Sequence, residues 1–95
     1  YNIAVLQIDD PESPFPSGLP LGDASAMEEG DPAYGLDFGS APAGQGRIPQ
    51  ALKTRIAALK AVTRDKNMFE LEPGFQPEHD GGPLLDRRGK VIGIV

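Results

Sequence analysis

Two consecutive glycines followed by a proline, Gly81-Gly82-Pro83, restrict the fold of this chain more than any other feature of its sequence. Glycine adopts positive φ angles freely and allows close approach of backbone segments. Proline has no N–H to donate, so within a sheet it suits the first residue of a strand. Short apolar runs at 84–85 and 91–95 then flank a polar turn that contains a glycine. This pattern predicts a β-hairpin that begins at the glycine-proline corner.

The composition also favours a loop-rich β protein. Ninety-five residues form one domain at most, with a small core. Twelve glycines and ten prolines argue against a helical bundle, whereas an apolar content of 39% argues against disorder. The chain has no cysteine, so neither a disulfide nor a thiolate metal site is available. No apolar run is long enough to span a bilayer and no leader is evident, so we expect no membrane association.

The net charge of −5 is unevenly distributed along the chain. The first 46 residues contain eight acidic residues and no Lys or Arg, whereas residues 47–66 contain six basic residues and one acid. We expect this contrast to reflect internal or solvated charge. Nucleic-acid surfaces interleave basic with aromatic side chains, and the basic segment has no aromatic residue. We therefore expect no nucleic-acid partner.

Apolar patterning predicts further elements along the chain. Residues 2–8 are apolar almost throughout, which predicts a strand buried on both faces. Residues 11–20 are rich in proline and are expected to form an extended linker. Asp23 is a suitable N-cap for a single helical turn at 24–27. Weaker alternation of apolar residues predicts strands at residues 32–38 and 68–72.

The segment 50–64 leaves both helix and strand open. It is rich in helix formers, and Leu52 and Ile56 recur at helical spacing. However, Leu52, Thr54, Ile56 and Ala58 also alternate as the residues of a strand do. We predict the strand, because pairing in the tertiary structure commonly overrides local propensity.

Several of these segments resemble trypsin-like serine peptidases, in particular the bacterial HtrA type. That family has a nucleophile loop of the form Gly-Asn-Ser-Gly-Gly-Pro, and Asp-Gly-Gly-Pro-Leu-Leu-Asp at residues 80–86 is similar to its second half. Pro-Leu-Gly-Asp at 20–23 and Val-Ile-Gly-Ile at 91–94 also match the HtrA-type pattern. The resemblance covers nearly the whole chain.

The resemblance implies an all-β fold, namely a partial second β-barrel of antiparallel strands of the chymotrypsin type, with a proline-rich N-terminal linker. Residues 1–10 would be the last strand of a first barrel that this chain lacks. Residues 11–20 would be the linker between the barrels. Residues 21–95 would form the incomplete second barrel, with a degenerate nucleophile loop at 77–83.

The same resemblance assigns positions to the candidate site residues. Asp80 stands at the position of the nucleophilic serine, and Asn2 stands at that of the triad aspartate, although Asn2 is equally explained as a residue that begins a strand. Glu78 and Asp80 occupy the oxyanion-hole positions. Glu72 and Gly74 occupy positions of the substrate pocket.

These residues do not supply the chemistry of a serine peptidase, which needs a hydroxyl nucleophile, an imidazole base, a carboxylate that orients it and N–H donors for the oxyanion. A carboxylate such as Asp80 is a poor nucleophile toward an amide. His79 is the only histidine, and we expect it to be an exposed loop residue. His79, Glu78 and Asp80 lack the spacing of a metal site. We therefore expect neither a metal nor a cofactor.

Three interpretations remain open. The chain is an inactive peptidase remnant that binds or scaffolds, part of a serine endopeptidase that needs a first barrel supplying His and a Ser at position 80, or a small β domain without peptidase ancestry. An incomplete barrel has unpaired strand edges. We therefore expect a peptide or protein ligand, or self-association, at the edge formed by residues 92–95.

Overall fold

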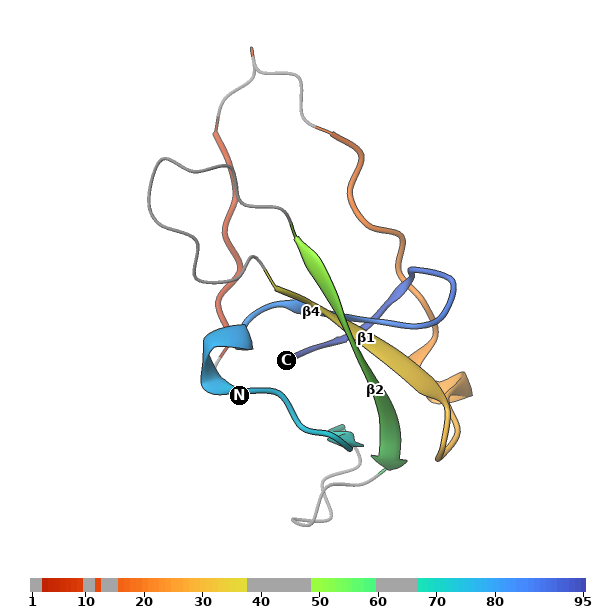
Figure 1. Ribbon diagram of the computed structural model, residues 1–95. Coiled ribbons are helices and arrows are strands. Elements are labelled where there is room, and N and C mark those ends of the chain that lie inside the picture. Colours follow the sequence, from red (N-terminus) through yellow and green to blue (C-terminus); the bar gives the residue numbers. More distant parts are fainter. Residues whose placement is uncertain (1–2, 10–11, 13–15, 38–48, 60–66) are drawn as a thin grey trace.

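The computed structural model describes residues 3–9, 12, 16–37, 49–59 and 67–95 (Figure 1). Within them the strands are β1 Pro32–Asp37, β2 Gln50–Ala58, β3 Glu70–Leu71, β4 Pro83–Leu85 and β5 Val91–Ile94, and two single-turn 3-10 helices are η1 Ala24–Ala26 and η2 Pro77–His79. The strands pair antiparallel in the order β3-β2-β1-β4-β5. The predicted all-β fold of antiparallel strands is therefore confirmed. No helix of the described segments has the length and apolar character to cross a membrane.

The hairpin predicted at the glycine-proline corner is present. Strand β4 begins at Pro83 and pairs with β5, with an irregularity in register next to Leu85. Gly81 has a φ of 86°, in the region that favours glycine. A Cβ on Gly82 would lie 3.1 Å from the carbonyl oxygen of Leu36, so the second glycine permits a close approach of backbones.

The hairpin turn is closed by a side chain. The Asp86 carboxylate accepts hydrogen bonds from the backbone N–H of Arg88, at 2.8 Å, and of Lys90, at 3.0 Å. The bond from Lys90 is the largest cause of a lowered pKa of Asp86, and the bond from Arg88 and the charges of both residues add to it, against a smaller opposing effect of desolvation. The turn therefore favours the ionised carboxylate.

The segment 50–64, for which the sequence left both helix and strand open, forms a strand in its described part, as predicted. Strand β2 pairs with β1 from Pro32↔Arg55 to Asp37↔Gln50, and its other edge pairs with β3. Thr54 and Ile56 are buried and Arg55 between them is exposed, which is the alternation of a strand. Pairing on both edges satisfies backbone groups that a helix would satisfy locally. Residues 60–64 of the prediction lie outside the described residues.

The core is small, as the chain length implies. Its buried side chains come from β1, β2, β4 and β5, and they are Ala33, Ile56, Leu84 and Ile92. Partly buried apolar side chains pack against this cluster, and they are Met27, Phe69, Leu71, Phe75 and Val95. The core thus consists of a few contacts between segments that are distant in the sequence.

The strand expected at residues 2–8 is not formed in the described part of that range, residues 3–8. Those residues form no strand, and Val5 and Leu6 are 94% and 89% exposed. The prediction of a doubly buried strand is wrong here, because no described strand pairs with the segment. In Figure 1 the segment, in red, runs outside the sheet.

The segment around Leu21 covers part of the outer edge of β5. The Val91 N–H donates to the Pro20 carbonyl and the Val91 carbonyl accepts from the Gly22 N–H, both at 2.8 Å. Asp23 then caps η1, as predicted: its carboxylate accepts from the Ser25 N–H at 3.0 Å. The hydroxyl of Ser25 and then its N–H lower the pKa of Asp23.

Candidate functional site

The candidate site is the loop 77–83, which joins η2 to β4. Pro77 begins the 3-10 turn, where its missing N–H costs nothing. Asp80 ends the turn and is exposed. Glu78 lies in the turn, and its side chain is outside the described residues. The loop thus leaves the Asp80 side chain in solvent directly after the turn.

Four consecutive backbone N–H groups of this loop, those of residues 79–82, donate hydrogen bonds within the protein. The Asp80 N–H donates to the Pro77 carbonyl at 3.1 Å and the His79 N–H donates to the Gln76 carbonyl at 2.9 Å. The Gly81 N–H donates to the Val95 carbonyl at 2.8 Å. An oxyanion hole requires N–H donors directed at an external oxygen. The Asp80 N–H, at one of the two expected oxyanion positions, is therefore already occupied.

His79 is the residue whose environment differs most from the expectation. Its side chain is 14% exposed, so the prediction of an exposed loop residue is wrong. Nδ1 accepts a hydrogen bond from the Gln76 N–H at 3.0 Å, and Nε2 lies 3.2 Å from Asp37 Oδ2. Because Nδ1 accepts, the neutral ring carries its proton on Nε2 and donates it to Asp37. With both nitrogens engaged, the imidazole is not available as a base toward Asp80.

The burial of His79 results from contacts between segments distant in the sequence. Asp37 is at the end of β1, and the edge of the His79 ring meets the ring of Phe75 with centroids 5.8 Å apart. A Cβ on Gly35 would lie 2.8 Å from the Phe75 ring, so the ring packs directly on β1. Sequence reasoning missed this contact. A glycine inside a strand, which commonly marks close approach, was the available indication.

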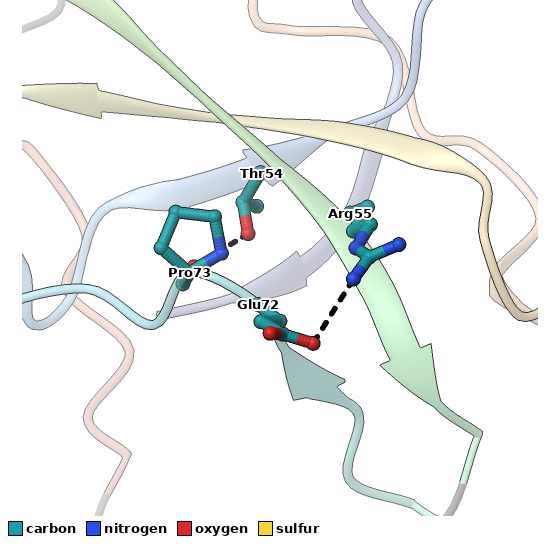
Figure 2. A network of polar contacts seen from close by, with 4 residues as sticks. All are labelled: Thr54, Arg55, Glu72 and Pro73. Carbon is teal, nitrogen blue, oxygen red and sulfur yellow. Dashed lines mark hydrogen bonds and ion pairs between the residues drawn. The ribbon is translucent and has the colours of Figure 1, made fainter.

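Glu72 and Gly74, the residues expected at substrate-pocket positions, lie in the segment between β3 and η2. The Glu72 carboxylate forms an exposed ion pair with Arg55 at 3.1 Å (Figure 2). The neighbouring Pro73, which follows a cis peptide bond, accepts a hydrogen bond from the hydroxyl of buried Thr54 at 2.5 Å. Gly74 is exposed. These contacts attach the segment to β2, apart from Asp80.

Asp80 lines a cavity of about 420 Å³, together with Ile3, Ala4, Gly81, Ile94 and Val95. A second cavity, of about 610 Å³, runs from β3 to β5 and shares Ile3 and Ile94 with the first. Its remaining lining is uncharged and mostly apolar: Ala24, Ser25, Asn67, Met68, Phe69, Leu71, Leu84, Ile92 and Gly93. We call this second cavity the apolar groove. Its chemistry suits an uncharged, extended segment better than a polar reactant.

Comparison with known proteins relates this geometry to a family. A family model described as a trypsin-like peptidase domain matches residues 1–94. No curated protein matches the sequence. The match extends over the antiparallel sheet, the glycine-proline corner and the loop at Asp80. From its first residue almost to its last, the chain belongs to the family of trypsin-like peptidase domains.

Proposed function

We propose that this chain is a catalytically inactive serine peptidase remnant of the HtrA type that binds an extended peptide or protein segment. The observation that carries the proposal is the state of the loop at Asp80. An acid stands at the position of the nucleophile, and its N–H donates to Pro77. The same loop holds the imidazole of His79 in hydrogen bonds to Gln76 and Asp37.

The chemistry of position 80 supports inactivity. A carboxylate attacking an amide would form an anhydride, and its charge would repel the developing oxyanion. The reactions of this family need a hydroxyl whose proton passes to an imidazole. Asn2, at the position of the triad aspartate, and Glu78, at the oxyanion position, remain predictions, because Asn2 and the Glu78 side chain lie outside the described residues.

The apolar groove supports the binding role. It lies beside the edge strand β5, whose backbone can pair with an added strand. An extended ligand would place alternate side chains into the groove and leave the others in solvent. This arrangement favours ligands with apolar residues at every second position.

Activity assays test the proposal that the chain has no peptidase activity. We expect the purified chain not to cleave casein and not to be labelled by a serine-directed fluorophosphonate probe. We expect Asp80→Ser to remain inactive by itself, because His79 is held by Asp37 and the N–H of residue 80 already donates to Pro77. Cleavage of casein by the unchanged chain that disappears in Asp80→Ala would overturn the proposal.

The alternative function is a serine endopeptidase that needs a first barrel supplying a histidine and a serine at position 80. The exposed apolar segment 3–8 favours it, since such a segment suits pairing with further strands. The test is Asp80→Ser mixed with a first barrel from an HtrA-type enzyme. Casein cleavage in this mixture, absent when either component is omitted, would support the alternative.

A further inference from the structure

His79 is the only histidine of the chain, and its two ring nitrogens have partners of different kinds. Nδ1 accepts a hydrogen bond from the Gln76 N–H at 3.0 Å, and Nε2 lies 3.2 Å from Asp37 Oδ2. The neutral imidazole satisfies both partners at once, because one of its nitrogens accepts and the other donates. The imidazolium has two donors, so it satisfies Asp37 but not Gln76. Protonation therefore strengthens one contact and removes the other.

The charged groups around the imidazole are acidic. Among the described residues, the charged group in contact with the ring is Asp37, at the end of β1, and the uncharged ring of Phe75 packs against it. The two neighbours of His79 in the chain, Glu78 and Asp80, are also acidic. Asp80 is exposed, and the Glu78 side chain lies outside the described residues. These charges attract an imidazolium where the ring already stands, beside Asp37.

The Gln76 N–H is the partner that the protonated ring loses. The side chains of His79 and Asp37 are only 14% and 24% exposed, and a charge-assisted hydrogen bond is about twice as strong as a neutral one. Gln76 is exposed, so water can accept its N–H once Nδ1 no longer does. Two N–H donors cannot remain directed at each other across 3.0 Å, so Gln76 moves away from the ring.

We infer that His79 is a pH switch of the loop at Asp80. A proton taken up on Nδ1 releases the Gln76 N–H and loosens the start of η2, while the ion pair with Asp37 keeps the ring in place. Histidine is the side chain whose charge ordinarily changes between about pH 5 and 8. The next residue, Pro77, accepts the Asp80 N–H at 3.1 Å, so the N–H at the expected oxyanion position depends on the same turn. The inference goes beyond the proposed function and is independent of it, because it concerns contacts within the chain and no ligand.

Nuclear magnetic resonance of the full, isotope-labelled chain between about pH 8 and pH 5 tests the switch. We expect the Nδ1 resonance of His79 and the amide resonance of Gln76 to titrate with one midpoint. The protection of the Gln76 amide against hydrogen exchange should fall by about fivefold, the ratio that one ordinary hydrogen bond gives. The Gly89 amide is the internal control, because it donates to the Asp86 carbonyl at 3.0 Å in a turn that contains no histidine. A Gln76 amide that does not follow His79, or a Gly89 amide that follows it equally, would overturn the inference.

Two variants distinguish the switch from a general effect of acid. His79→Asn retains an acceptor oxygen near the position of Nδ1 but takes up no proton, so the Gln76 amide should keep its resonance over the same range. Asp37→Asn removes the carboxylate that faces the imidazolium, so the shared midpoint should move to lower pH. A Gln76 amide that still titrates in His79→Asn would contradict the switch. If His79→Asn does not fold, Asp37→Asn decides, because a midpoint that stays unchanged there would also contradict it. Neither measurement uses casein cleavage or peptide binding, so failure of the proposed function would leave both results unaffected.

Discussion

His79 Nε2 and Asp37 Oδ2 lie 3.2 Å apart, although the two residues are separated by 42 positions in the sequence. This contact attaches the loop at Asp80 to the end of β1. It also fixes the tautomer of the imidazole, because the other ring nitrogen accepts from Gln76. The histidine therefore holds the loop in position, and its two ring nitrogens face Gln76 and Asp37 and not Asp80.

We expect His79→Ala to destabilise the chain by about 1–3 kcal/mol, since it leaves the Gln76 N–H without its acceptor and Asp37 without its donor. Chemical denaturation measures the change. Asp37→Asn retains an acceptor oxygen for the imidazole and should cost less. A change for His79→Ala of under about 0.5 kcal/mol, the range of ordinary surface substitutions, would contradict a positioning role.

Gly35→Ala should destabilise by about 1–3 kcal/mol, because the added methyl group would overlap the ring of Phe75. Thermal or chemical denaturation gives the value. Gly18→Ala is the matched control, since a Cβ there has no neighbour within 4 Å. In the double variant Gly35→Ala/Phe75→Leu the two effects should not add, because the smaller side chain makes room for the methyl group. If the changes in the free energy of unfolding added fully, the close contact between residue 35 and the Phe75 ring would be contradicted.

Asp86 makes stability depend on pH. Hydrogen bonds from the backbone of Lys90 and Arg88 lower its pKa in the folded chain below the ordinary value of 3.8. The contribution of the ionised Asp86 carboxylate to the stability of the folded chain is therefore complete at pH values above the ordinary pKa. It is lost as the pH falls through the lower pKa of the folded chain. Denaturation at a series of acidic pH values should show a weaker loss of stability in Asp86→Asn than in the unchanged chain. Equal pH dependence in both would contradict the role of this turn.

The two contacts of Figure 2 should differ in their effect on stability. Thr54→Val removes a buried hydroxyl and leaves the Pro73 carbonyl without that donor, which should cost about 1–3 kcal/mol. Arg55→Gln removes an ion pair whose side chains are 59% and 67% exposed, and should cost under about 1 kcal/mol. Unfolding in urea compares the two variants. A larger loss for Arg55→Gln would reverse this order.

Local backbone chemistry made part of this fold predictable from the sequence. The positive φ of Gly81, the start of β4 at Pro83 and the cap at Asp23 each depend on restrictions that act within a few residues. The β-hairpin was predictable for the same reason, since its two apolar runs are joined by a short polar turn. The family resemblance marked the loop at Asp80 through this same corner.

The sequence by itself determined where the chain turns and which residues begin its strands, because those choices depend on neighbours in the chain. Only the tertiary structure decided that β2 is a strand, because its backbone is satisfied by pairing on both edges with β1 and β3. Only the tertiary structure decided that His79 is buried against Asp37 and that residues 3–8 are exposed. Burial depends on which distant segments supply partners, and neither propensity nor spacing contains that information.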